Sequence, residues 1–400
     1  MASPPGRFRA LSHYRLLPGI AGWPALVVAF LARTPYAMVP LGVMMAFTAS
    51  TGNIAIGGMA TGVASASTAM AAPLLGRVAE HIGQRPLLLV VIPINAMGLL
   101  GLFLISLGSG APWYLWLLCV VTGATAIPVG SFTRARWVRL TTAPHQLTAA
   151  FSYESMADEL VFVLGPALVG IAASAAMPSA PLGLAFLLMV IAGLPFAVMA
   201  PREVSATSRS DKVSIPRVIR AVVVPVAVLI AVGIFFGASQ VGITQRAENI
   251  GAPGDAGLVY AVMGIGSAIA AILVVTIPDS IPFWKRLVVS ALGMSAGMAL
   301  IGFAGSLGTT TLLMAITGFF IGPCLVTTFS LAEKLAPPAG VTVAMTSMAS
   351  SVTVGVALGS SLGGNIARAL GADWAFWLAA LAAALIVFLS LGARRVPERE

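Results

Sequence analysis

The chain has 400 residues, of which 58% are hydrophobic and 9% are charged, and its formal net charge is +9. Soluble domains carry about 25% charged residues, and the apolar runs here are too long and too many to pack into one soluble core. The composition therefore excludes an ordinary soluble protein and indicates a helical membrane protein with many spans.

Apolar segments separated by polar or Gly/Pro-rich breaks predict twelve transmembrane helices. The first is too long for the apolar region of a signal peptide, so we expect it to be retained. The expected limits are 22–48, 54–75, 87–107, 113–133, 147–173, 181–200, 217–240, 255–276, 287–306, 309–331, 342–367 and 374–392.

The basic residues predict the orientation of these spans. With the N-terminus in the cytoplasm, most of the 22 Lys and Arg residues fall in cytoplasmic segments. Arg246 and Arg368 fall outside, and Arg33 lies within the first span. The positive-inside rule then places both termini in the cytoplasm of a cell inner (plasma) membrane. Membrane topology therefore explains the positive charge, and we expect no nucleic-acid partner.

The longest polar stretch divides the spans into six and six. Short sequence matches recur in the same order on both sides of it, such as the Ser-Met-Ala of residues 155–157 and 347–349. Such a parallel repeat is typical of two related six-helix halves. The predicted organisation is an N-terminal half over 1–200, a cytoplasmic linker over 201–216 and a C-terminal half over 217–400.

The segment between the second and third spans contains Gly76, Glu80, Gly83 and Arg85. This spacing resembles the signature loop of the major facilitator superfamily, and the six-plus-six spans extend the resemblance to the whole chain. The resemblance implies an all-α integral membrane protein with twelve transmembrane helices in two pseudo-symmetric six-helix halves. It also implies that Glu80 and Arg85 latch one half against the other in the outward-open state. The alternative is a solvated turn.

The fifth span contains Gly165 and Pro166, followed by Gly170. This pattern resembles a motif of the superfamily's bacterial drug- and sugar-efflux proton antiporters, although Ile171 stands where the motif usually has a second glycine. The resemblance implies export by antiport. The alternative is an ordinary close contact between helices through small residues.

The same span carries Glu154, Asp158 and Glu159. Each acid costs about 2.5–3.5 kcal/mol to insert into a membrane, so it must be neutralised, paired or used. Glu154 and Asp158 share one helix face, and Glu159 is turned about 100° away. We expect Asp158 to be the proton-coupling site, with Glu154 as second choice and Glu159 as a structural partner. The candidate charge partners are Arg33, Arg134 and Arg136.

Two other interpretations of these charges stay open. They could form a fixed salt-bridge network, or they could recognise the substrate directly. Polar and aromatic residues on other spans are candidates for the lining of a substrate cavity, and a mostly apolar lining suits an amphipathic or lipophilic small molecule. These candidates are Tyr36, Asn95, Tyr153, Phe236 and Gln240.

The sequence thus predicts a secondary active transporter that exports small molecules by proton antiport with alternating access. The alternatives are a proton symporter that imports a small solute and a membrane sensor of the same fold that transports nothing. The three histidines do not cluster, and Cys119 and Cys324 lie within apolar segments. We therefore expect no metal, cofactor or enzymatic activity, and a monomer whose partners are the substrate, protons and the lipid bilayer.

Overall fold

The computed structural model describes residues 16–109, 111–201, 215–274, 277, 280–337 and 341–392, and over these residues it contains helices and no strand. The N-terminal helices are α2 (Leu17–Ala21), α3 (Trp23–Thr51), α4 (Ile54–Ile82), α5 (Gln84–Ser106), α6 (Tyr114–Ala124), α7 (Val129–Leu140), α8 (Pro144–Ala175), α9 (Ala180–Leu188), the π-helical turn η1 (Met189–Gly193) and α10 (Leu194–Val198). The C-terminal helices are α11 (Ile215–Ala221), α12 (Val223–Asn249), α13 (Asp255–Leu273), α14 (Phe283–Gly302), α15 (Leu307–Leu335), α16 (Val341–Leu370) and α17 (Ala372–Gly392).

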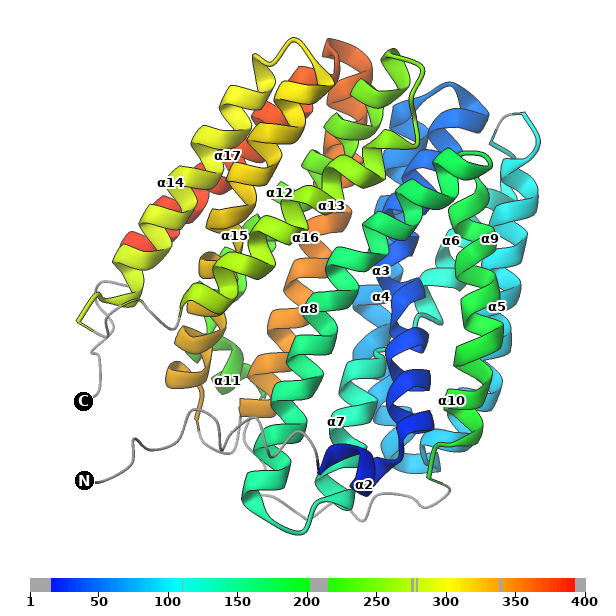
Figure 1. Ribbon diagram of the computed structural model, residues 1–400, viewed down its shortest axis with the longest axis vertical. Helices are drawn as coiled ribbons and strands as arrows, with labels where there is room; N and C mark the ends of the chain where they lie inside the picture. Colours follow the sequence, from blue (N-terminus) through cyan, green and yellow to red (C-terminus); the bar gives the residue numbers. More distant parts are fainter. Residues whose placement is uncertain are drawn as a thin grey trace, which may run out of the picture.

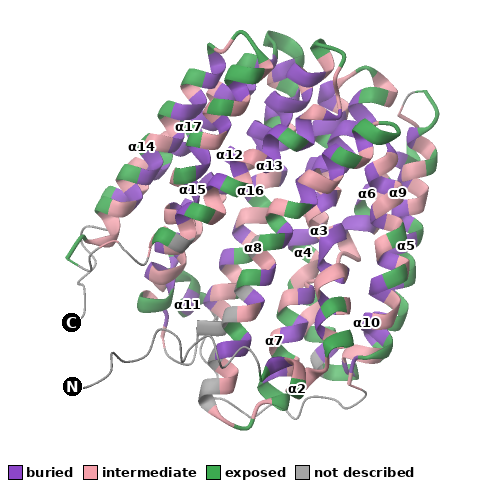
Figure 2. Ribbon diagram, viewed as in Figure 1, coloured by how far each residue is buried: buried purple, intermediate pink, exposed green. Residues whose placement is uncertain are grey.

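Within the described part of the chain, eleven helical segments are long and apolar enough to cross a membrane, and the apolar helix over Asp255–Ala271 is shorter. Large apolar side chains such as Met70, Trp113 and Phe388 are exposed on the outside of the bundle. Exposed and buried positions alternate along the helices in Figure 2. Lipid tails suit such an apolar surface, and the predicted all-α fold with twelve transmembrane helices is confirmed.

Figure 1 shows the helices running between two ends of the molecule. The lower end holds α2 and the turn between α4 and α5, and the upper end holds the turn between α3 and α4. We call α2–α10 the N-terminal half and α11–α17 the C-terminal half. Residues 202–214, most of the predicted linker, lie outside the described residues, so the domain boundaries stay a prediction.

The two halves meet closely where α4 passes α16. A methyl group added at Gly58 would lie 2.5 Å from the backbone oxygen of Ser360 and 3.0 Å from the Cα of Gly364. One added at Gly62 would lie 2.9 Å from the backbone oxygen of Ala357. These glycines follow the first residue of α4 closely, so this backbone-to-backbone contact lies toward the upper end of the molecule.

A second close contact between the halves joins α8 to α13. A methyl group at Gly257 would lie 2.4 Å from the backbone nitrogen of Gly170, and one at Gly254 would lie 2.7 Å from the Cα of Ser174. Both glycines stand at the start of α13, again toward the upper end. We call this pair of α4–α16 and α8–α13 contacts the upper contact.

The fourth span differs from its prediction as one helix over 113–133. It consists of α6 and α7, with residues 125–128 between them outside any helix. Pro128 causes this break because it has no backbone N–H to donate and disfavours helical geometry at Ile127. The Asn95 side chain stabilises the broken end by donating from Nδ2 to the backbone oxygen of Thr122 at 2.8 Å.

The seventh span also differs from its prediction over 217–240. The helix α12 runs from Val223 to Asn249, so Arg246 is part of a helix and not of an outer loop. Its side chain is buried and donates from Nη1 to the backbone oxygen of Ile301 at 3.1 Å and to Oγ1 of Thr310 at 2.6 Å. The span was predicted to end before Arg246 because this residue is charged. Its hydrogen-bond acceptors instead allow the arginine to be buried within the helix bundle.

Candidate functional site

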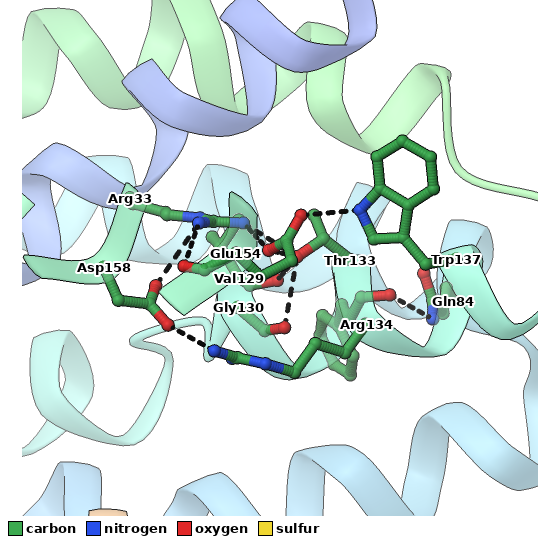
Figure 3. A network of polar contacts seen from close by, with 10 residues as sticks. Arg33, Gln84, Val129, Gly130, Thr133, Arg134, Trp137, Glu154 and Asp158 are labelled. Atoms are coloured by element: carbon green, nitrogen blue, oxygen red, sulfur yellow. Dashed lines mark hydrogen bonds and ion pairs between the residues drawn. The ribbon is translucent and has the colours of Figure 1, made fainter. Parts of the chain in front are cut away.

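Glu154 is more deeply buried than Asp158, with 1% of its side chain exposed. Its Oε1 accepts a hydrogen bond of 2.7 Å from the indole nitrogen of Trp137. Its Oε2 accepts from the hydroxyl of Thr133 and pairs with the guanidinium of Arg33. Figure 3 shows these groups converging on the carboxylate. Both carboxylate oxygens therefore have partners inside the protein.

Asp158 lies one helical turn further along α8 and has a different environment. Its Oδ1 is 3.3 Å from Nη1 of Arg33, and its Oδ2 is 2.8 Å from Nη2 of Arg134. About a third of each side chain is exposed, 33% for Asp158 and 34% for Arg134. This carboxylate is therefore shared between two cations and is open on one side.

Arg33 connects the two acids. It comes from α3, it is 4% exposed, and besides both carboxylates it contacts the Thr133 hydroxyl at 2.8 Å. Its Nε has no hydrogen-bond partner among the described residues. We call Arg33, Arg134, Glu154 and Asp158 the charge network. Two cations and two anions balance, which offsets much of the cost of placing charges inside a membrane.

The break in the fourth span brings α7 to this network. Thr133, Arg134 and Trp137 all lie on α7, which starts directly after Pro128. A methyl group at Gly130, in the first turn of α7, would lie 3.0 Å from Oδ1 of Asp158 and 2.9 Å from Nη1 of Arg134. Glycine at this position therefore lets the Asp158 carboxylate approach the N-terminus of α7, whose partial positive charge favours an anion.

Arg136, a predicted partner of the acids, has partners elsewhere. Its Nε donates to Oε1 of Gln84 at 2.9 Å, and its Nη2 donates to the backbone oxygen of Phe196 at 3.3 Å. Its guanidinium carbon lies 3.9 Å from the centre of the Phe196 ring. Two residues along a helix turn by about 200°, so Arg134 and Arg136 point to different sides of α7.

Two predicted residues have side chains outside the described part of the chain, namely Glu80 and Glu159. The Glu80–Arg85 latch and the structural role of Glu159 therefore stay predictions. The backbone of the loop is described: α4 ends at Ile82, and α5 begins at Gln84. Gly83 joins them with φ of 89°, a left-handed conformation that favours glycine.

The other predicted glycines differ in their surroundings. Gly76 lies within α4, and a methyl group there would meet nothing within 4 Å. A methyl group added at Gly165, one residue before Pro166, would lie 2.6 Å from the Cβ of Ala37 on α3. Gly170 belongs to the upper contact. The motif on α8 therefore packs this helix closely against α3 and α13, whereas its predicted role in antiport stays open.

The predicted cavity residues have different neighbours among the described residues, and their place in a cavity stays a prediction. The Tyr36 hydroxyl lies 3.3 Å from the Thr353 hydroxyl on α16. Asn95 lies on α5, and its buried side chain reaches the end of α6. Tyr153 packs on the cluster that contains Leu17 and Trp137. Phe236 packs on the main apolar core beside Phe235, with ring centroids 5.8 Å apart. Gln240 is buried, and its Oε1 has no hydrogen-bond partner among the described residues.

Sequence analysis missed three residues of the site: Gly130, Thr133 and Trp137. The spacing of Thr133 and Trp137 carried a usable signal, because residues four apart share one helix face. A hydroxyl and an indole N–H on the same face of a membrane helix indicate a buried hydrogen-bond acceptor opposite them. Gly130 gave no comparable signal among the 42 glycines of the chain.

Several solved structures share this fold. A variant of the nucleoside transporter NupG is 13% identical to the chain, with a TM-score of 0.72, and the match covers 92% of this chain and 98% of that one. A variant of a peptide transporter POT is 15% identical, with a TM-score of 0.71 and 94% of each chain covered. The POT family transporter PepTSo is 13% identical, with a TM-score of 0.65, covering 98% and 100%. No curated protein sequence matches the chain significantly.

The sequence model of the Major Facilitator Superfamily matches residues 23–352 and 228–400. Together these two matches extend from the start of α3 to the end of the chain. The helical architecture described above agrees with this match. The chain therefore belongs to the Major Facilitator Superfamily and is a multi-pass membrane transporter.

Proposed function

We propose that the protein is a secondary active transporter that exports small molecules by proton antiport, with Asp158 as the proton-carrying group. The observation that carries the proposal is the environment of this carboxylate. It is shared between Arg33 and Arg134, and a third of it is exposed. A coupling group must exchange protons with water and must also change its contacts when it does so.

Glu154 meets neither requirement. Its side chain is 1% exposed and accepts from Trp137 and Thr133 while it pairs with Arg33. Protonation there would place an O–H among the donors Arg33 and Trp137, which both need this carboxylate as an acceptor. Glu154 is better suited to hold Arg33 and α7 in place, so that Arg33 presents a fixed cation to Asp158.

The coupling follows from the shared carboxylate. Ionised Asp158 holds Arg33 on α3 and Arg134 on α7 at the same time. Protonation removes the charge and weakens both contacts, which leaves Arg134, about a third exposed, free to contact other partners. The two protonation states thus favour different arrangements of α3, α7 and α8, and a substrate that favours one of them competes with the proton.

The proposal that transport is export rests on the motif of Gly165, Pro166 and Gly170 on α8. Gly165 packs against α3 and Gly170 against α13, so this motif joins the charge network to the upper contact. Proton-coupled import of a small polar solute is the second candidate, because solved structures of this fold include a nucleoside transporter and a peptide transporter. Phe236 packs on the main apolar core, and an apolar lining favours an amphipathic or lipophilic cargo for export.

The proposed orientation places the lower end and both termini in the cytoplasm of the plasma membrane. Arg77, Arg139, Arg220 and Lys334 lie at the lower ends of their helices, as the positive-inside rule requires. A reporter fused after residue 400 that is active only in the cytoplasm should give a signal. A signal from a reporter that is active only outside the cytoplasm would reverse the orientation.

Transport by vesicles tests the proposal directly. Everted membrane vesicles with an imposed acidic interior and a pH-sensitive dye should lose their gradient when a transported compound is added. A panel of amphipathic amines, nucleosides and dipeptides covers both candidates. Release of vesicle protons by one compound supports antiport, whereas uptake of that compound together with protons into right-side-out vesicles supports symport.

The Asp158→Asn variant should abolish the proton movement. Asp373→Asn is the matched control, because Asp373 also pairs with an arginine but is 60% exposed and lies in the C-terminal half. Loss of proton coupling in both variants, or in neither, would remove Asp158 from the proposed role.

A further inference from the structure

The hydroxyls of Tyr36 and Thr353 form a polar contact between the two halves. Tyr36 lies on α3 and Thr353 on α16, and their oxygens are 3.3 Å apart. Hydrogen bonds between hydroxyls usually measure 2.5–3.0 Å. This bond is therefore long and weak, and a small movement of either helix can break it.

Tyr36 stands beside the charge network. It follows Arg33 by three residues on α3, so the two side chains share one helix face. The Tyr36 hydroxyl is hydrogen-bonded to Thr353, and Asp158 is close enough for its charge to act on this side chain. One side chain therefore contacts the C-terminal half and lies near the proposed proton site.

Thr353 stands on the helix that forms part of the upper contact. Seven residues further along α16, Ser360 lies against Gly58 of α4. Seven residues are about two helical turns, so Thr353 and Ser360 share one face of α16. A shift of α16 at Thr353 is therefore passed along a rigid helix to the upper contact.

We propose that Tyr36 couples the charge state of Asp158 to the C-terminal half through its hydrogen bond to Thr353. This inference rests on the proposed function. While Asp158 is ionised, Arg33 is held between Asp158 and Glu154, and Tyr36 stays in reach of Thr353. When Asp158 is protonated, Arg33 loses one anionic partner, α3 moves relative to α8, and the Tyr36–Thr353 bond breaks. Helix α16, which forms part of the upper contact, then loses its hydrogen bond to α3.

The groups around Asp158 limit which residues can produce a pH response. Among the described side chains, the neighbouring helix α3 contributes Arg33 and Tyr36, α7 contributes Arg134, and α8 itself contributes Glu154 and Tyr153. The other helices packed on α8 are α2, α9 and α13. Helices α2 and α9 have no titratable side chain, and α13 has Asp255 at its upper end and the buried Tyr260.

Distance measurements between spin labels on the full-length protein in lipid nanodiscs test this inference. The labels replace Arg77 on α4 and Glu333 on α15, which are both exposed, and the native Cys119 and Cys324 are buried. The distance distribution of the otherwise unchanged protein should shift between mildly alkaline and mildly acidic pH. In Tyr36→Phe and in Thr353→Val this shift should be lost.

Thr353→Ser is the matched control, because it keeps the hydroxyl and should keep the pH-dependent shift. The double variant Tyr36→Phe/Thr353→Val should behave like either single variant. If Tyr36→Phe does not fold, as judged by its melting temperature, the Thr353→Val and Thr353→Ser pair still decides the question.

The outcomes separate this inference from the proposed function. If Asp158→Asn keeps the pH-dependent shift, or if the unchanged protein shows none, the proposed proton site is wrong and the inference falls with it. If Asp158→Asn loses the shift while Tyr36→Phe and Thr353→Val both keep it, Asp158 is the proton site and Tyr36 does not couple it.

Discussion

Each half of the molecule contains a buried arginine on its first long helix, and the two are held differently. Arg246 on α12 donates to a backbone oxygen and to the Thr310 hydroxyl, and it lies 4.7 Å from the centre of the Phe376 ring. Its one described acidic partner is Asp373, which is 60% exposed. Arg33 on α3 has two acidic partners, and Asp158 is shared with Arg134.

The difference supports the proposal that the Arg246 contacts are structural and that the charge network couples transport to protons. Arg246 ties α12 to α14, α15 and α17, and no second cation competes for Asp373 among the described residues. In the charge network, by contrast, Asp158 has two cations and can release either of them. A carboxylate with alternative contacts can change its state without unfolding its surroundings, and this is the property that energy coupling needs.

The largest effect on stability is expected for Glu154→Ala. This change leaves Arg33, Thr133 and the Trp137 indole without their shared acceptor. Breaking one side of a buried ion pair costs about 3–5 kcal/mol. Thermal unfolding in detergent should show a large fall in melting temperature, and Asp373→Ala should show a small one. Equal falls in the melting temperatures of the two variants would mean that the contacts of Arg33 and of Arg246 do not differ in the way described.

A smaller loss is expected for Arg246→Ala. The Ile301 oxygen and the Thr310 hydroxyl lose a charged donor, while Asp373 stays solvated and needs no replacement. Loss of a charged hydrogen bond costs about 1.5–3 kcal/mol. Transport by the folded fraction should keep its proton coupling. A specific loss of coupling at unchanged expression would give Arg246 a functional role.

Asp158→Asn should have a milder effect on stability than either change above. The side chain is partly solvated, and pairs of this kind contribute about 0–1 kcal/mol. The amide can still accept a hydrogen bond from Arg33 or Arg134. Melting temperatures of the variant and the unchanged protein should differ little, although proton coupling is lost. A fall as large as that of Glu154→Ala would make Asp158 a structural residue.

The smallest stability effect is expected for Gly130→Ala. The added methyl group would meet the ends of the Asp158 and Arg134 side chains, which are partly exposed and can move. We expect a cost below about 1 kcal/mol together with a shifted pH dependence of transport. Gly76→Ala is the matched control, since nothing lies within 4 Å of its new methyl group. An identical pH dependence in both variants would show that the Gly130 contact is unimportant.

Much of the fold could be predicted from the sequence because a membrane span is a local property. Apolar runs locate the helices, and the shared face of Glu154 and Asp158 follows from helix geometry alone. The break of the fourth span at Pro128 has a local cause that the prediction overlooked. The error in the seventh span occurred where partners distant in sequence decide the outcome. Arg246 extends α12 because Ile301 and Thr310 accept from it, and no local pattern shows this.

The site was predictable in its charged members and not in their roles. Burial distinguishes Glu154 from Asp158, and burial depends on Trp137 and Arg33, which come from other helices. Asn95 was expected at the cavity because it is polar within an apolar span. Its side chain donates a hydrogen bond to the backbone oxygen of Thr122 at the end of α6. Arg136 was expected beside the acids, although the helical turn between positions 134 and 136 already argued against it.

The upper contact has a consequence for the energy difference between transport states. Glycine and serine backbones meet there directly, so small residues form the closest backbone contacts between the halves. Two packings of the same helices can then differ by only a few kcal/mol. A change of one unit in the pKa of a single group is worth about 1.36 kcal/mol, a sizeable part of such a difference. When the halves meet through glycine backbones, one proton and one small ligand acting together can therefore reverse the populations of the two transport conformations.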